Sequence, residues 1–160
     1  MSDQSLLDLG QPLLDEVAGV LSRMPAGVIT GIADEIDAAR HVVFHSAGRN
    51  GLMLRAFVMR LYHLGLDAHM VGDMATPPVG PGDLLLVNAS TGDIPSGLAH
   101  IEAAVATRAW VCVFTAAPGG AASMLGDRSF VLPAQTMLDD LRVCPGILSG
   151  IAKFSEHEAD

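Results

Sequence analysis

The sequence is poor in cysteine and in aromatic side chains. Its 160 residues include 2 Cys, 1 Trp, 1 Tyr and 5 Phe. Cys112 lies in the apolar run WVCVF and Cys144 follows Arg142 and Val143, so neither belongs to the C-x-x-C spacing that metal and redox sites use. We therefore interpret both residues as buried or incidental thiols.

Positive charge and long hydrophobic runs are also scarce. The chain has 9 Lys and Arg against 18 Asp and Glu, a formal net charge of −9, and no basic cluster. Such a chain repels a nucleic-acid backbone, so we expect no nucleic-acid partner. No apolar run approaches the roughly 18 residues of a membrane span, and the N-terminus MSDQSLLDLGQ lacks a cationic leader segment. We expect a cytoplasmic protein without a membrane partner.

Apolar residues, by contrast, make up 50% of the chain, chiefly Ala, Leu, Val, Ile and Met. A chain of this length can bury one sizeable core, so the sequence predicts a single domain over residues 1–160. Apolar residues at helical spacing, interrupted by Pro25, predict two N-terminal helices within residues 1–40. A sheet core is expected over 41–133 and a short C-terminal helical segment over 134–160.

The sheet core alternates short apolar runs with helical patterns. Such alternation indicates an α/β fold, a three-layer, doubly wound sandwich around a five-stranded parallel sheet. The expected strands are Val42–Phe44, Ala68–Val71, Leu84–Asn88, Trp110–Phe114 and Phe130–Leu132, and the expected helices are Leu52–Leu64, Ser96–Ala106 and Ala121–Leu125.

The stretch HVVFHSAGRNG, residues 41–51, takes an apolar strand into a small, donor-rich loop before a helix. Phosphate binds at such points in parallel-sheet proteins, because free N–H groups of the helix N-terminus face the anion. Gly48 lies in this loop, and Ser46, Arg49 and Asn50 add a hydroxyl, a cation and an amide. The loop therefore predicts a site for a small anion, such as a phosphate ester.

A second loop of similar character, Asn88–Asp93, follows the next central strand. We expect Ser90, Thr91 and Asp93 to meet the first loop, because ligands bind at the carboxyl edge of a parallel sheet. An alternative is that the polar residues of both loops only cap the helices that follow them. Capping does not account for Arg49, which stands among small residues.

Three blocks of the sequence resemble a known family. They are the Ser-x-Gly-Arg-x-Gly turn at 46–51, the block MRLYHLG at 59–65, and Gly72-Asp73 followed by Thr76-Pro77. In this order and spacing they look like the sugar isomerase (SIS) fold, and more narrowly like the 6-phospho-3-hexuloisomerases, over roughly residues 28 to 140.

The resemblance implies a flavodoxin-like, five-stranded parallel sheet and isomerisation of a sugar phosphate through an enediol. It implies a homodimer or homotetramer whose sites are completed by a neighbouring subunit, and neither a metal nor an organic cofactor. Proton transfer between adjacent carbons needs only a base, an acid and an anchored phosphate.

The resemblance also suggests catalytic residues. His63 matches a family histidine, and Asp139 occupies the region of the family's catalytic glutamate, with Asp140 and Asp93 as alternatives. A structural role for His63, and a helix-dipole role for Asp139, are the competing interpretations. The histidines at 41, 45, 69, 100 and 157 show no pairing with carboxylates that suggests a metal site, although His45 enters the first loop.

The second loop departs from the family pattern. Ala89 and Ile94 replace two hydroxyl-bearing residues, and Asp93 replaces a glutamate. A competing function is therefore a non-catalytic sugar-phosphate-binding module, a sensor or regulator. A dinucleotide-binding domain is disfavoured, because Ser46–Gly51 lacks the G-x-G-x-x-G pattern.

Overall fold

The computed structural model describes residues 6–136. The chain divides into two compact units, one of Pro25–Leu132 and one of Met1–Met24 with Pro133–Asp160. The single domain expected over 1–160 stays a prediction. Asp139, Asp140 and most of the segment expected over 134–160 lie outside the described residues.

In the first unit, helix α1 spans Leu6–Arg23 and confirms the first N-terminal helix. Its last residue, Arg23, donates a hydrogen bond from Nη2 to the carbonyl oxygen of Pro133 at 3.2 Å. Leu14, Val17 and Leu21 are spaced by three and four residues, so they share one helical face, and all three are exposed.

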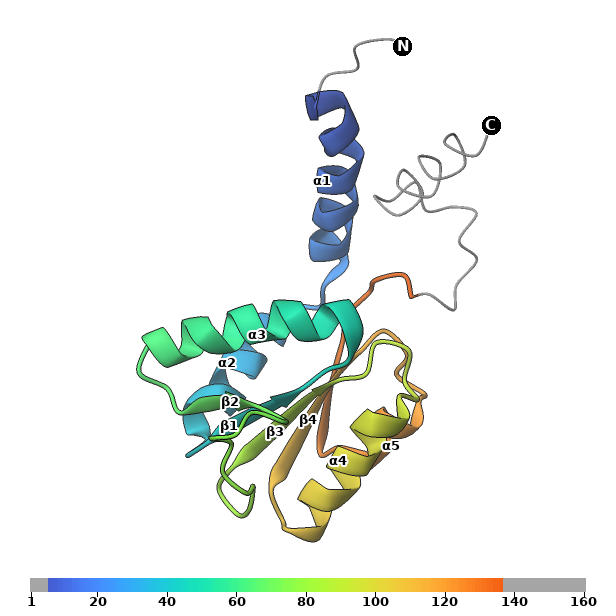
Figure 1. Cartoon of the computed structure of the whole chain (residues 1–160). Helices are drawn as coiled ribbons and strands as arrows, with labels where there is room; N and C mark the ends of the chain where they lie inside the picture. Colours follow the sequence, from blue (N-terminus) through green and yellow to red (C-terminus); the bar gives the residue numbers. More distant parts are fainter. Residues whose placement is uncertain (1–5, 137–160) are drawn as a thin grey trace, which may run out of the picture. The chain divides into compact units, whose positions relative to one another are not determined.

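The second unit is the predicted α/β domain (Figure 1). Its elements are α2 (Val28–Ala38), β1 (Val42–His45), α3 (Gly48–His63), β2 (Ala68–Met70), β3 (Leu84–Asn88), α4 (Pro95–Ala106), β4 (Trp110–Thr115), α5 (Ala121–Leu125) and β5 (Arg128–Val131). All five strands are parallel and lie in the order β2-β1-β3-β4-β5. This is the flavodoxin-like order, which confirms the predicted fold class.

Helices cover both faces of the sheet. One core cluster joins Ile36 of α2 and Val58 and Leu61 of α3 to alternate strand residues such as Phe44 and Leu86. The opposite cluster joins Ile101 and Ala104 of α4 and Ala122 of α5 to the other set of alternate strand residues. Because successive strand residues point to opposite faces, a strand buried on both faces reads as a continuous apolar run, as LLLV does in β3.

Two element boundaries differ from the expected ones by more than one residue. Helix α3 begins at Gly48 rather than Leu52, so Arg49 and Asn50 belong to its first turn. Strand β5 begins at Arg128 rather than Phe130, because Arg128 pairs with Cys112 of β4. The Arg128 side chain forms an ion pair with Glu35 of α2 at 2.7 Å. This pair neutralises the arginine charge at the start of the strand, where the apolar pattern predicted no strand residue.

None of the helices in the described part of the chain has the length and apolar character needed to span a membrane. Cys112 is fully buried in β4, and burial, more than the nearby Glu35 carboxylate, raises the pKa of its thiol to about 12. The prediction of a buried thiol is confirmed for Cys112, whereas Cys144 lies outside the described residues.

Candidate functional site

The two polar loops follow neighbouring strands at the point where the strand order reverses. β1 pairs in parallel with β3, and His45 at the end of β1 is in register with Val87. From β1 the chain crosses through α3 to β2, whereas from β3 it crosses through α4 to β4 on the other side. The Ser46–Asn50 and Asn88–Asp93 loops therefore leave the same edge of the sheet, at its topological switch point.

The helices that follow the loops have no side-chain caps. The N-cap residues are Ala47 for α3 and Ile94 for α4, and neither helix start receives a side-chain hydrogen bond. Among the described residues, the only hydrogen bond of the Ser46 hydroxyl is a long one, 3.5 Å, to the carbonyl oxygen of Ala47. The capping interpretation is thus wrong for these two helices, and no side chain of residues 6–136 bonds to their first N–H groups.

Two glycines shape the first loop. Gly48 has a φ of 59°, a left-handed conformation that favours glycine. A Cβ atom on Gly51 would lie 2.8 Å from the carbonyl oxygen of Ser46, so only glycine lets the first turn of α3 pack against the end of β1. The spacing of the Ser-x-Gly-Arg-x-Gly turn thus has a steric origin.

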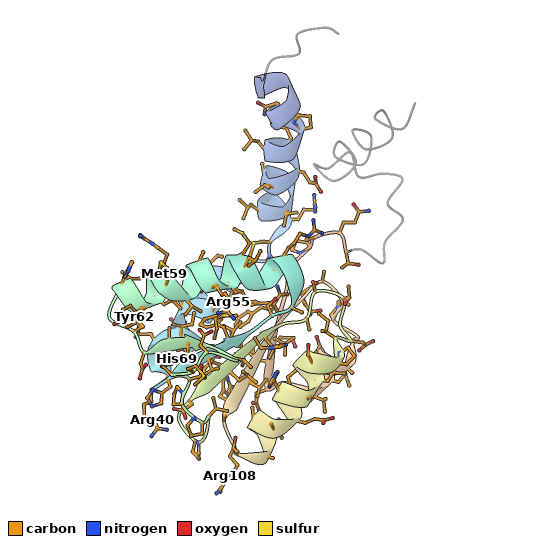
Figure 2. The ribbon with its side chains drawn as sticks, in the orientation of Figure 1. Arg40, Arg55, Met59, Tyr62, His69 and Arg108 are labelled. Atoms are coloured by element: carbon orange, nitrogen blue, oxygen red, sulfur yellow. The ribbon has the colours of Figure 1, made fainter. Side chains whose placement is uncertain are left out.

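The cation in the first loop is unpaired. Arg49 and Asn50 are exposed, and within residues 6–136 neither side chain has a hydrogen-bond or ion-pair partner. The next arginine on α3, Arg55, binds Asp73 at 2.6 Å, which ties α3 to the segment after β2 (Figure 2). Arg49 is therefore left as the cation that an incoming anion meets at this edge.

The backbone holds the second loop firmly. Ala89 N–H donates to the carbonyl oxygen of Phe114 at 2.8 Å, and Ala116 N–H donates to the carbonyl oxygen of Ser90 at 3.1 Å. The side chains of Ser90 and Thr91 are half-buried and, within the described residues, make no hydrogen bond. Their hydroxyl groups are thus positioned by a fixed backbone and are free to bind a ligand.

Asp93 has a structural contact of its own. One of its carboxylate oxygens, Oδ1, accepts a hydrogen bond from the N–H group of Ala121 at 2.7 Å. Ala121 begins the short helix α5. Asp93 therefore links the second loop to a helix start, as a cap does, although the helix is α5 rather than α4.

Sequence reasoning missed two partners of His45. The His45 Nε2 atom lies 3.3 Å from the Ser96 hydroxyl oxygen, and its ring centroid lies 4.5 Å from that of His100. Burial, and secondarily the charge of His100, lower the pKa of His45 below its ordinary value. Ser96 and His100 are four residues apart on α4, so they share one helical face, and this spacing was the available signal.

His63 lies at the far end of α3 from the first loop. The helix has 16 residues, and a rise of about 1.5 Å per residue places His63 roughly 22 Å along the axis from Gly48. Its ring is exposed and lies beside that of Tyr62, with centroids 6.3 Å apart. One chain therefore does not bring His63 to the Ser46–Asn50 loop, and Asp139 lies outside the described residues.

The amino edge of the sheet, opposite the loops, holds a second polar group. His41 and His69 both contact the Asp67 carboxylate, at 2.5 and 2.6 Å. The interpretation of these histidines as unpaired with carboxylates is wrong. Strand pairing brings His41 to Asp67, which is 26 positions away, and His69 lies two residues from Asp67 in the sequence. A surface hollow of about 420 Å³, lined in part by Pro81, Trp110 and Asp127, lies at this same edge and so is not the phosphate site.

Comparison with known proteins agrees with the motifs. No family model matches the chain. It is 34% identical over 125 residues to a 3-hexulose-6-phosphate isomerase of Mycobacterium gastri, covering 78% of this chain. The chain spans only 63% of that relative's length.

Two solved structures share the fold. One is a protein of Methanococcus jannaschii, whose structure was described as inferring a 3-hexulose-6-phosphate isomerase function. It matches with a TM-score of 0.68 at 23% sequence identity, and the match covers 77% of this chain and 73% of the other chain. The sugar isomerase domain of an RpiR transcription factor from Sphaerobacter thermophilus has a TM-score of 0.67 at 14% identity, covering 84% and 78%. The resemblance to sugar isomerase domains, and to 6-phospho-3-hexuloisomerase in particular, is confirmed.

Proposed function

We propose that this chain is a phosphosugar isomerase of the 6-phospho-3-hexuloisomerase type. The observation that supports this best is the pair of loops at the switch point, where two helix starts, three hydroxyl groups and one arginine leave the same edge of the sheet. Within the part of the chain that the structure describes, neither helix start has a side-chain cap and Arg49 has no side-chain partner. These groups suit a phosphate dianion, because N–H dipoles and a cation both favour negative charge. The relative from Mycobacterium gastri bears the name of the same activity.

Groups from both loops bind the phosphate of the substrate. The backbone N–H groups at the start of α3, together with Ser46, Arg49 and Asn50, bind the phosphate from one side. Ser90 and Thr91 bind it from the second loop, which hydrogen bonds to β4 and its following loop hold in place. An anchored phosphate presents the same two carbons to the proton-transfer groups at every encounter, which lowers the entropic part of the barrier.

Proton transfer then needs a base and an acid near these carbons. By resemblance, Asp139 moves the proton between neighbouring carbons while His63 assists the oxygens. His45 is a further imidazole at the correct edge, and its lowered pKa keeps it neutral near pH 7, able to accept a proton. All three roles belong to the proposal.

A second copy of the chain would supply His63. Within one chain this histidine is far from the first loop, so its catalytic use requires a neighbouring subunit. Met59 and Tyr62, which lie on the same helix (Figure 2), are 59% and 70% exposed, and Met53 is 71% exposed. Apolar side chains of this size on one helix favour burial in an interface, so we propose a homodimer or homotetramer with shared sites. We also propose that the protein is cytoplasmic.

A coupled assay tests the activity. The complete chain should convert arabino-hex-3-ulose 6-phosphate into fructose 6-phosphate, and Asp139→Ala should abolish turnover while leaving sugar-phosphate binding intact. Full activity in the Asp139→Ala variant would remove this residue from the mechanism.

The second candidate is a non-catalytic sugar-phosphate-binding module. Ala89 and Ile94, where the family has hydroxyl-bearing residues, favour it, and the transcription factor from Sphaerobacter thermophilus shows that the fold occurs in a regulator. Stabilisation of the chain by fructose 6-phosphate without turnover of any sugar phosphate would support the module over the enzyme.

A further inference from the structure

The side chains of His41, Asp67 and His69 meet at the amino edge of the sheet. His41 precedes β1, Asp67 precedes β2, and His69 is the second residue of β2. Val42 pairs with Ala68 and Val43 with His69, so the register places His41 opposite Asp67. Asp67 and His69 are two residues apart and therefore project from the same face of the strand.

The backbone fixes this arrangement. Val42, the residue after His41, donates a hydrogen bond from its N–H group to the carbonyl oxygen of Asp67 at 2.9 Å. A shift of one residue in the register would send Asp67 and His69 to the opposite face. The pairing of β1 and β2 thus brings the three side chains together.

The donor atoms converge on a small space. His41 Nδ1 lies 2.5 Å from Asp67 Oδ2, and His69 Nε2 lies 2.6 Å from Asp67 Oδ1. One potential ligand atom from each residue lies within 4.8 Å of the other two. The side chains are 26%, 51% and 21% exposed for His41, Asp67 and His69, so a hydrated ion can reach them without opening the core.

We propose that His41, Asp67 and His69 form a binding site for one divalent transition-metal ion of the Zn²⁺ class. Two imidazole nitrogens and one carboxylate oxygen are ligands that Zn²⁺ accepts, at about 2.0–2.2 Å, with water in the fourth position. Ca²⁺ and Mg²⁺ prefer oxygen ligands, so two imidazoles disfavour them. This site is separate from the phosphate loops and goes beyond the proposed isomerase function.

The geometry needs only a small adjustment to hold the ion. Donor atoms around a tetrahedral Zn²⁺ are roughly 3.4 Å apart, given bonds of about 2.1 Å. The observed hydrogen bonds of 2.5 and 2.6 Å must therefore lengthen by under about 1 Å, which rotation of three partly exposed side chains allows.

Neighbouring charges leave the cluster available. Another carboxylate at this edge, Asp83, binds Arg40 at 2.9 Å and its side chain is fully buried, so it does not compete for the ion. His41 and His69 each hydrogen bond to a different oxygen of the Asp67 carboxylate. Metal binding would replace these hydrogen bonds and would connect the edge strand β2 to β1.

Titration of the EDTA-treated complete chain with ZnCl₂ at pH 7.5 tests the site. We expect one ion per chain by calorimetry, and a rise in Tm of roughly 5–10 °C at a hundredfold excess over Kd, because the ion binds the folded state. CoCl₂ should develop the strong visible absorption of four-coordinate Co²⁺. His69→Gln should lose all three responses, whereas the matched control His63→Gln, which removes an exposed histidine elsewhere, should keep them.

A second variant keeps the test decisive if His69→Gln fails to fold. Asp67→Asn retains a side chain that can hydrogen bond to both imidazoles but is a poor metal ligand, so its metal-free Tm should stay close to that of the unmodified chain while the Zn²⁺ response disappears. An unchanged Zn²⁺ stoichiometry in Asp67→Asn, or Co²⁺ that keeps the weak spectrum of the aquo ion, would overturn the proposal.

Discussion

Gly92 in the second loop and Gly120 before α5 are in direct backbone contact: a Cβ atom on Gly120 would lie 2.5 Å from the Gly92 Cα. The contact is one of backbone against backbone, so side-chain rotation cannot relieve it. It holds the loop that contains Ser90 and Thr91 against the turn that follows β4. The second half of the proposed phosphate site therefore depends on two glycines that touch no ligand.

Gly120→Ala should displace the second loop and weaken phosphate binding. We expect a loss of about 1–3 kcal/mol in unfolding free energy from overpacking, together with a higher Kd for fructose 6-phosphate. Urea unfolding and calorimetric titration measure the two effects. Gly119→Ala is the control, because a Cβ atom there meets nothing within 4 Å, and an equal loss in both variants would contradict the steric argument.

Arg49→Ala should weaken sugar-phosphate binding by about 1.5–3 kcal/mol, the usual range for a hydrogen bond to a charged group. This corresponds to roughly a 10- to 150-fold rise in Kd, measured by calorimetry with fructose 6-phosphate. Because the Arg49 side chain is exposed and unpaired in the described structure, the unfolding midpoint should stay unchanged. Arg108→Ala, at an exposed arginine on the opposite edge, is the control, and equal affinities for both variants would count against the anion site.

Two variants that impair different residues of a shared site should complement one another if the sites are shared between subunits. Arg49→Ala removes the cation that binds the phosphate in its own subunit. His63→Ala removes the imidazole that its subunit supplies to the site of the neighbouring subunit. Random mixing of dimers leaves half of them mixed, each with one intact site of two, so roughly a quarter of the unmodified activity should return. Subunit exchange followed by the coupled assay measures this. If mass spectrometry verifies the subunit exchange and the activity still does not recover, His63 acts within its own chain or has no catalytic role.

Asp83 should make stability depend on pH in acid. The hydrogen bond from Arg40, and a further one from the Gly80 N–H, lower the pKa of this buried carboxyl. A folded pKa below the unfolded value of about 3.9 stabilises the protein above that value, and the contribution is lost as pH falls through the folded pKa. Urea midpoints measured from pH 6 to pH 2 should therefore fall less steeply in Asp83→Asn than in the unmodified chain.

Asp83→Asn should also be less stable at pH 7, by about 1–3 kcal/mol, because it weakens the hydrogen bonds of a buried group. Asp34→Asn, at an exposed aspartate of α2, should follow the unmodified chain at every pH. Parallel pH profiles for the unmodified chain and Asp83→Asn would show that another group governs the acid transition.

The sheet and its loops were largely predictable, because their signals are local. Apolar runs such as LLLV in β3 must be buried on both faces, and the glycines of the first loop satisfy a local steric demand. The start of α3 was less predictable: Gly48, Arg49 and Asn50 have no apolar periodicity, so the expected helix began four residues late. The extension of β5 to Arg128 depends on an ion pair with Glu35, 93 positions away in the chain.

The sequence by itself determined the α/β class, the parallel sheet and the two donor-rich loops, because periodicity and turn chemistry act over a few residues. Only the tertiary structure decided which side chains meet. Strand pairing joined His41 and His69 through Asp67, and the crossover through α4 placed His100 beside His45. The straight course of α3 separated His63 from its own phosphate loop. These relationships come from the register and direction of elements far apart in the chain, which no local pattern encodes.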